Sequence, residues 1–190
     1  MAKKKKRVYL IDAFAEIYRF YFAMFRNPLT NSKGENISAI FGFARSLYSI
    51  LKNDKPDYIA VVFDPKGPTF RHKMYKEYKA TREKMPDDLR SQLPMIDKVI
   101  KAFNISRLEL DEYEADDIIG TMAKKAEKEG CEVLMVTADK DFAQLVTDKV
   151  VMYNTRAKPD ESNLIDIEGV KKKWGVTLAQ IKDYLALVGD

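Results

Sequence analysis

Residues 113–141 read YEADDIIGTMAKKAEKEGCEVLMVTADKD, and this stretch decides the fold. Apolar residues recur at helical spacing up to Glu129, and Gly130 lies where a helix C-terminal cap is expected. The short apolar run Val133–Val136 then predicts a buried strand. A helix followed directly by a buried strand is the repeating unit of α/β folds with a parallel sheet.

The same alternation continues along the rest of the chain. Short apolar runs predict five strands, at Val8–Ile11, Tyr58–Phe63, Ile105–Leu110, Val133–Val136 and Val150–Tyr153. Amphipathic patterns predict helices at about 13–25, 36–52, 87–103, 113–129, 140–146, 166–174 and 177–188. We therefore expect an α/β fold with a mainly parallel central sheet.

Length and composition limit the class of protein. The 190 residues suffice for one domain with a proper core, and 46% of them are apolar, which excludes a disordered chain. The single cysteine, Cys131, cannot form an intrachain disulfide. Neither a signal peptide nor an apolar run of about 20 residues is present. We expect a soluble cytoplasmic protein that does not associate with a membrane.

The positive charge is concentrated in two places. The net charge is +4, yet Lys3–Arg7 alone carries +5. Residues 65–84 carry seven cations against two acids, which is another +5, so the remainder of the chain sums to −6. The stretch 65–85, called the arch segment below, is also long for a connection in a compact domain. A concentrated basic segment on a mildly acidic protein favours phosphate binding.

Acidic residues follow the predicted strands at the point where each strand ends. Asp12 follows the first run, Asp64 follows the second, and Asp139 and Asp141 come shortly after Val136. The helix after the strand ending at Leu110 opens with three more acids, which are Glu114, Asp116 and Asp117. Because parallel strands end at one edge of a sheet, all these carboxylates are expected at one crevice.

Two interpretations of these acids are open. Taken singly, Asp12 or Asp139 is better explained as a helix cap, and acids in a first helical turn suit the helix dipole. Taken together, carboxylates about 4 Å apart repel each other by about 4 kcal/mol at an effective dielectric of 20, so they need cations. Oxygen-only ligands favour Mg²⁺, with Mn²⁺ as a substitute. Acids from different loops suit two ions, which in phosphodiester hydrolysis lie about 3.5–4 Å apart.

The arch segment carries a basic and aromatic pattern. If residues 70–82 form a helix, one stripe contains Arg71, Tyr75, Tyr78, Lys79 and Arg82. Cations beside aromatic rings suit single-stranded nucleic acid, because phosphates take the charge and bases stack. The alternative is an ordinary amphipathic surface helix. The neighbouring acids favour a segment that contacts DNA and is mobile without it.

These motifs resemble the 5′ nuclease family, which includes the N-terminal domain of bacterial DNA polymerase I, stand-alone 5′–3′ exonucleases and flap endonucleases. The resemblance covers the full chain, and six segments carry it in order: Leu10–Asp12, Val61–Asp64, Phe70–Arg82, Tyr113–Asp117, Thr137–Asp141 and Leu187–Asp190. It implies a PIN-like, resolvase-like three-layer domain over 1–190 with a helical arch. The implied activity is Mg²⁺-dependent hydrolysis of DNA at or near a 5′ end or a 5′ flap, in replication and repair.

The resemblance also assigns roles to residues. The first metal site would use Asp12, Asp64, Glu114 and Asp116, with Asp117 beside it. The second would use Asp139, Asp141 and Asp190. Lys79 and Arg82 would be the catalytic basic pair that steadies the scissile phosphate. Arg71, Tyr75 and Tyr78 would contact DNA along the arch.

Two departures from the family pattern stand out. Ala13-Phe14-Ala15 replaces the usual glycine and small polar residues after the first aspartate. The sequence also stops at Asp190, before the next aspartate and the duplex-binding helix-hairpin-helix segment of the family. We therefore expect a chain without that segment, and the sequence leaves open whether a covalently linked polymerase domain belongs to the parent protein.

Three other functions are alternatives to this one. A haloacid-dehalogenase-type phosphatase needs its Asp pair directly at a strand end, whereas Thr137-Ala138 intervene here. A receiver domain needs an acidic pair after its first strand, where Asp12 stands alone. The serious alternative is a DNA-binding fragment with impaired catalysis.

Overall fold

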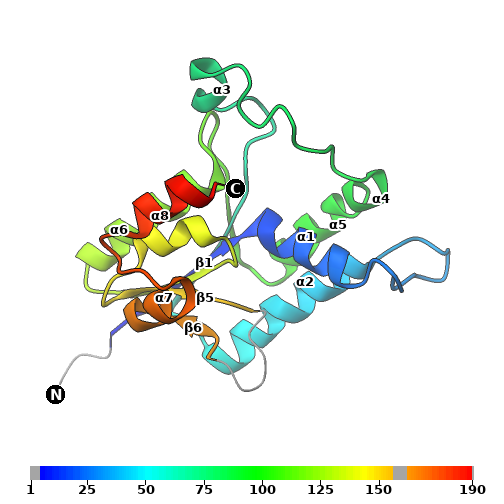
Figure 1. Cartoon of the computed structure of the whole chain (residues 1–190). Coiled ribbons are helices and arrows are strands. Elements are labelled where there is room, and N and C mark those ends of the chain that lie inside the picture. Colours follow the sequence, from blue (N-terminus) through cyan, green and yellow to red (C-terminus); the bar gives the residue numbers. More distant parts are fainter. Residues whose placement is uncertain (1–4, 156–161, 190) are drawn as a thin grey trace. The chain divides into compact units, whose positions relative to one another are not determined.

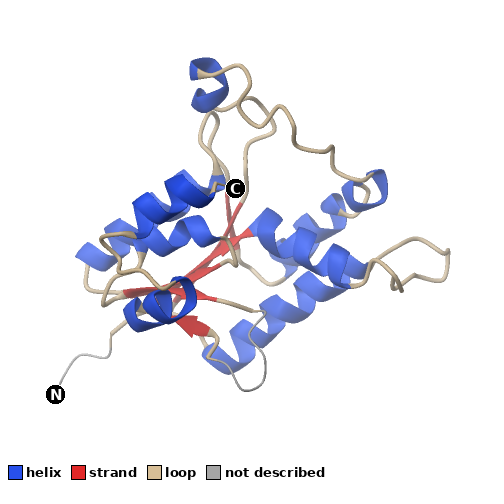
Figure 2. Cartoon of the chain, in the orientation of Figure 1, coloured by secondary structure: helices blue, strands red, loops and turns tan. Residues whose placement is uncertain are grey.

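The computed structural model describes residues 5–155 and 162–189, and these form a mixed α/β fold with a six-stranded sheet (Figures 1 and 2). The strand order is β3-β2-β1-β4-β5-β6. The bounds are β1 Arg7–Asp12, β2 Tyr58–Val62, β3 Ser106–Leu108, β4 Glu132–Val136, β5 Val150–Tyr153 and β6 Leu164–Ile165. All five predicted strands are confirmed. The sequence does not predict β6, because two residues are too few to show an alternation.

The sheet is mainly parallel, as predicted. β1 pairs with β4, β2 with β3 and β4 with β5 in parallel, and only the pairing of β5 with β6 is antiparallel. In the β1–β4 register Ile11 lies opposite Val136, so Asp12 and Thr137 follow at the same level. The residues after both strands therefore lie at one edge of the sheet.

Eight α-helices lie within the described residues. Their bounds are α1 Ala13–Ala23, α2 Ser38–Ser49, α3 Phe70–Met74, α4 Asp87–Arg90, α5 Leu93–Ala102, α6 Ala115–Lys128, α7 Ile167–Trp174 and α8 Ile181–Val188. A π-helical turn, η1, spans Ile50–Asp54, and a 3₁₀ helix, η2, spans Lys140–Leu145. Among the described helices, none combines the length and apolar character that a membrane crossing needs.

The chain divides into two compact units. Unit 1 contains the chain up to Asp12, the short piece Pro56–Ile59 and the chain from Asp116 on. Unit 2 contains Ala13–Lys55 and Ala60–Ala115. Unit 1 thus holds β1, β4, β5, β6 and α6, whereas unit 2 holds β3 and the helices from α1 to α5.

The core of unit 1 is formed by its strands and by α6. Val133, Met135 and Met152 are fully buried, since each is 0% exposed. Ile119 of α6 is buried at 1%, and the neighbouring Gly120 leaves room for the side chain of Leu145. A glycine at that helix position allows η2 to approach α6 closely.

The core of unit 2 is formed by α1 and α2, which run alongside each other (blue and cyan in Figure 1). Ile17 is 0% exposed, and Phe43 is 1% exposed. A Cβ at Gly42 would lie 2.3 Å from the ring of Phe20, so the glycine lets the two helices meet at this point. Tyr21 is buried too, and burial together with a 2.8 Å hydrogen bond to Asp88 raises the pKa of Tyr21 to about 12.

The predicted helix 87–103 is wrong as one element, because α4 ends at Arg90 and α5 begins at Leu93. Pro94 lies at the start of α5, where its missing N–H is harmless. Gln92, in the break, is 2% exposed and accepts hydrogen bonds from the backbone N–H groups of Ala39 and Ile40. The break therefore supplies a cap to the first turn of α2.

The helical interpretation of residues 70–82, on which the single stripe depended, holds for the first five residues alone. Only α3 is helical, and Tyr75 after it is extended, with φ −142° and ψ 108°. Lys79 has the left-handed φ of 56°, which interrupts any helix. Of the five residues of that stripe, Arg71 lies in α3, and the other four follow it in non-helical chain.

Candidate functional site

Glu114 is a buried carboxylate that three side chains of the arch segment contact. The residue is 5% exposed. The Lys79 ammonium donates to its Oε1 at 2.9 Å, and the Tyr78 hydroxyl donates to its Oε2 at 3.1 Å. A guanidinium nitrogen of Arg71 lies 3.6 Å from Oε2. The structure thus brings one predicted metal ligand together with three of the predicted DNA-contacting residues.

Local structure explains how these side chains reach Glu114. Thr69, itself 4% exposed, forms a capping box with His72 at the start of α3, the short helix that carries Arg71. The ring of His72 lies edge-on to that of Tyr78, with centroids 5.3 Å apart. The backbone of Lys79 is left-handed and changes the direction of the chain. The consecutive residues Tyr78 and Lys79 both contact the Glu114 carboxylate.

The electrostatics of this cluster keep Lys79 charged. Burial disfavours the ammonium, but its hydrogen bond and charge interaction with Glu114 outweigh that effect and raise the pKa of Lys79. Burial, helped by Glu114, also raises the pKa of Tyr78. Glu114 is therefore contacted by a charged ammonium, by a guanidinium and by a phenol that keeps its proton at neutral pH.

Asp64 lies next to this cluster in the fold. Its Oδ1 accepts a 2.7 Å hydrogen bond from the backbone N–H of Ala115, the first residue of α6. Asp64 therefore caps α6 although it lies 51 residues earlier in the chain. The same bond places the Asp64 carboxylate beside the residue that follows Glu114.

In unit 1, Asp12 and Asp139 follow neighbouring parallel strands. Asp12 is 7% exposed, and its Oδ2 accepts a 3.3 Å hydrogen bond from the hydroxyl of Thr137. Asp139 is the N-cap of η2, because its Oδ1 accepts from the backbone N–H of Asp141 at 2.9 Å. For Asp139 the capping interpretation is thus confirmed, without excluding a second role.

The remaining predicted ligands differ in their placement. Asp116 and Asp117 occupy the first turn of α6 and are partly exposed. Asp190 lies outside the described residues. Among residues 5–155 and 162–189, no three His, Cys, Asp or Glu side chains lie close enough together to hold one ion. The oxygen-only donors fit a hard divalent cation, whereas their described spacing does not form a complete cage.

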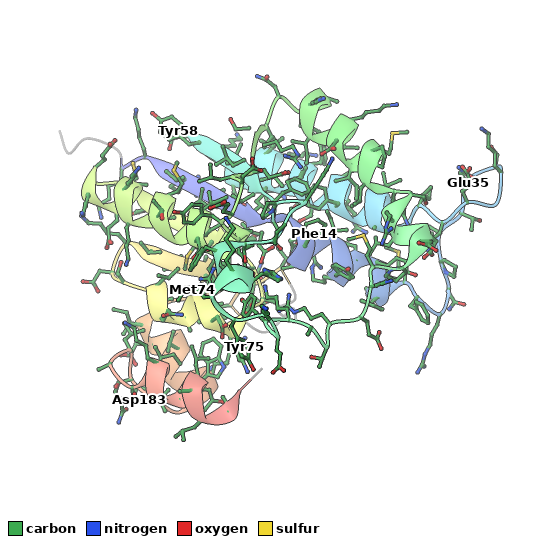
Figure 3. All side chains as sticks on the ribbon, turned by 90° about the horizontal axis from the view of Figure 1, so that it is seen from above. Phe14, Glu35, Tyr58, Met74, Tyr75 and Asp183 are labelled. Carbon is green, nitrogen blue, oxygen red and sulfur yellow. The ribbon has the colours of Figure 1, made fainter. Side chains whose placement is uncertain are left out.

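Two predicted DNA-contacting residues do not reach Glu114. Tyr75 is 59% exposed (Figure 3) and donates its hydroxyl to Glu77 at 2.8 Å. Arg82 is exposed and lies near Tyr18 of α1: burial raises the pKa of Tyr18, and the charges of Arg82 and Arg90 oppose that shift. The predicted basic pair is therefore split, with Lys79 on Glu114 and Arg82 toward α1.

The bulky residue after Asp12 has a structural role. The ring of Phe14 meets that of Phe63 edge-on, with centroids 5.6 Å apart, and also leans on Tyr18 at 6.4 Å (Figure 3). The departure at Ala13-Phe14-Ala15 thus adds an aromatic contact to unit 2. Sequence reasoning did not identify Thr137 as a partner of Asp12, although its position directly after β4 was the available signal.

Comparisons with known proteins agree on one family. Residues 7–175 match the 5′–3′ exonuclease, N-terminal resolvase-like domain. The chain is 44% identical over 187 residues to DNA polymerase I of Bacillus subtilis, covering 98% of this chain and 21% of that protein. It is 43% identical over 185 residues to the 5′–3′ exonuclease of Aquifex aeolicus, covering 97% and 62%. The chain thus spans about a fifth of its polymerase relatives.

A solved structure has the same fold. The bacteriophage T5 flap endonuclease, in a complex with DNA and metal ions, superimposes with a TM-score of 0.70 at 17% identity, covering 97% of this chain and 67% of that one. Similarity at this level of identity establishes the resolvase-like fold.

Proposed function

Because this chain belongs to the family of 5′–3′ exonuclease N-terminal, resolvase-like domains, we propose that it hydrolyses DNA phosphodiester bonds at or near 5′ ends. The observation that carries the proposal is the contact of the buried Glu114 with Lys79 and Arg71. The Glu114 carboxylate is a suitable ligand for a divalent cation, and it lies within 4 Å of Lys79 and Arg71, two cations suited to bind phosphate. The activity is 5′–3′ exonucleolytic or flap-cutting, in DNA replication and repair.

We propose that the cation is Mg²⁺, with Mn²⁺ as a substitute. The oxygen ligands of the first site would come from Asp12, Asp64, Glu114 and Asp116, with Asp117 beside them. Those of the second would come from Asp139, Asp141 and Asp190. Bound divalent ions of this kind neutralise phosphate charge and make water more acidic. Hard cations and carboxylate oxygens are chemically matched.

The chain's own cations would orient the DNA. Lys79 and Arg82 would hold the scissile phosphate, and Arg71, Tyr75 and Tyr78 would contact the strand near it. The exposed ring of Tyr75 is available for stacking on a base. The substrate is DNA with a 5′ end or 5′ flap, and a polymerase domain in the same protein is the proposed partner.

A 5′-labelled flap substrate tests the proposal directly. With Mg²⁺ we expect release of short labelled products, and none with a chelator. Asp116→Asn should lower the cleavage rate about 100-fold or more, because it removes a proposed ligand. Asp183→Asn changes another exposed acid in a first helical turn, in α8, and should cleave normally (Figure 3). Full activity of Asp116→Asn would refute this ligand set.

A second candidate function is DNA binding without cleavage. The observation in its favour is that, over the described ranges, no three acids gather closely enough to hold an ion. Binding of the flap substrate without products, at any Mg²⁺ or Mn²⁺ concentration tested, would support this candidate over the nuclease.

A further inference from the structure

The carboxylate of Glu114 is fully engaged by the arch segment. Both oxygens have partners: Oε1 accepts from Lys79 at 2.9 Å, and Oε2 accepts from Tyr78 at 3.1 Å with Arg71 at 3.6 Å. The Glu114 side chain is 7% exposed, and those of Lys79 and Arg71 are 24% and 31% exposed. These four residues are called the Glu114 latch below.

The latch is a main attachment of the arch segment within unit 2. Before it, Phe70 contacts Tyr113 with ring centroids 5.7 Å apart, and Lys73 pairs with Glu112 at the surface. Beyond Met74, which is 80% exposed, most residues up to Lys84 face solvent (Figure 3). Because exposed ion pairs contribute little, the buried contacts on Glu114 determine how firmly the later part of the segment is held.

A divalent cation and the latch compete for the same oxygens. The Lys79 ammonium takes one lone pair of Oε1 and brings its positive charge within 2.9 Å of that atom. The ammonium would also repel a divalent cation twice as strongly as it repels a unit charge at the same distance. Charge repulsion therefore opposes close binding of a divalent cation by Glu114 while Lys79 and Arg71 stay in contact with it.

We propose that Glu114 is a switch between two states, in which it either holds the arch segment through the latch or binds a divalent cation and releases the segment. The proposal rests on the proposed function, because it takes Glu114 as a metal ligand. Release frees Lys79 and Arg71 to meet phosphate, so metal binding prepares the segment for DNA. The latched state also places two cations against a buried carboxylate when metal is absent.

Hydrogen exchange of the arch segment, read by mass spectrometry, tests the switch without measuring activity. Saturating Mn²⁺ should speed exchange of the amides in 75–84 by about tenfold or more, as expected for loss of charge-assisted hydrogen bonds. Glu114→Gln should exchange fast without Mn²⁺ and should not respond to it.

Lys79→Met provides a second variant if Glu114→Gln fails to fold. It removes the competing ammonium, so its affinity for Mn²⁺ by calorimetry should rise about tenfold above that of the wild type. Lys76→Met is the matched control: Lys76 is an exposed lysine of the same segment, and this change should leave both exchange and affinity near wild type.

The outcomes separate this inference from the proposed function. If Mn²⁺ binds and DNA is cleaved while exchange of 75–84 is unchanged, the switch is overturned and the nuclease stands. Equal or weaker Mn²⁺ affinity of Lys79→Met would overturn it as well. If neither Mn²⁺ binding nor cleavage is found, the proposed function fails, and the switch fails with it.

Discussion

Asp139 and Asp64 show that one carboxylate can serve the fold and remain available for chemistry. Each accepts a backbone N–H at the start of a helix, Asp139 in η2 and Asp64 in α6. A cap uses one carboxylate oxygen and leaves the other free for a further ligand. The capping and metal-binding interpretations are therefore compatible at the same residue, and substitutions can separate them.

Two substitutions of Asp139 separate its roles. Asparagine caps helices about as well as aspartate, so Asp139→Asn should keep the thermal stability of the metal-free protein while losing most cleavage. Asp139→Ala should lose both, with a loss of about 1 kcal/mol in the free energy of unfolding. Unfolding by urea and cleavage of a labelled flap measure the two effects. Normal cleavage by Asp139→Asn would leave Asp139 with the capping role alone.

At the scale of elements, strands could be predicted more reliably than the helical segments. The runs at 8–11 and 133–136 are short, apolar and buried on both faces, which is a local property of the sequence. The predicted helix at 87–103 is interrupted before Pro94, which cannot donate the hydrogen bond of a continuous helix. Gln92 in the break then bonds to α2, a tertiary contact that periodicity does not contain. The arch segment departs from a helix for the same reason, since Tyr78 and Lys79 turn toward a distant acid.

In the candidate site, too, features with a local sequence signal could be predicted, whereas tertiary contacts could not. Asp12, Asp64 and Asp139 could be predicted to lie at the carboxyl edge of the sheet, because the position of an acid after an apolar run is visible in the sequence. The contacts of Glu114 with Arg71 and Lys79 span 43 and 35 residues of chain and could not be read from spacing. Thr137 was missed because a hydroxyl carries no charge pattern.

The contact between α1 and α2 depends on one glycine. A Cβ at Gly42 would lie within 2.7 Å of three Phe20 atoms, including its Cβ, so rotation of the ring alone cannot relieve the clash. We expect Gly42→Ala to lower the free energy of unfolding by about 1–3 kcal/mol, despite the better helix propensity of alanine. Urea unfolding of the purified variant measures the loss.

A matched background identifies the cause of that loss. In a Phe20→Ala chain the two ring atoms at 2.3 and 2.4 Å are gone and only the Cβ at 2.7 Å remains, so Gly42→Ala should there cost less stability, and the difference is the double-mutant coupling. If Gly42→Ala is stabilising in both backgrounds, α1 and α2 do not need the glycine to pack.

For the whole molecule, the uneven charge distribution leads to a quantitative prediction of how DNA affinity depends on salt. The net charge is +4, and the arch segment carries more than that by itself. When lysine or arginine neutralises a phosphate, counterions are released, and the affinity then depends steeply on salt. A net charge spread evenly over the surface would give a similar attraction at a distance but no particular residue on which the salt dependence rests.

Arg82 and Lys172 allow these two cases to be compared. Both are exposed cations, Arg82 in the arch segment and Lys172 in α7, so replacing either by alanine lowers the net charge equally. In the presence of a chelator, which removes the divalent cations that the proposed cleavage needs, Arg82→Ala should reduce the slope of log affinity against log salt by about 0.7–0.9, the value of one phosphate contact. Lys172→Ala should leave the slope unchanged. Fluorescence anisotropy with a labelled flap at several salt concentrations measures both slopes. If the two variants change the slope by the same amount, net charge alone attracts the DNA and the arch segment is not its contact surface.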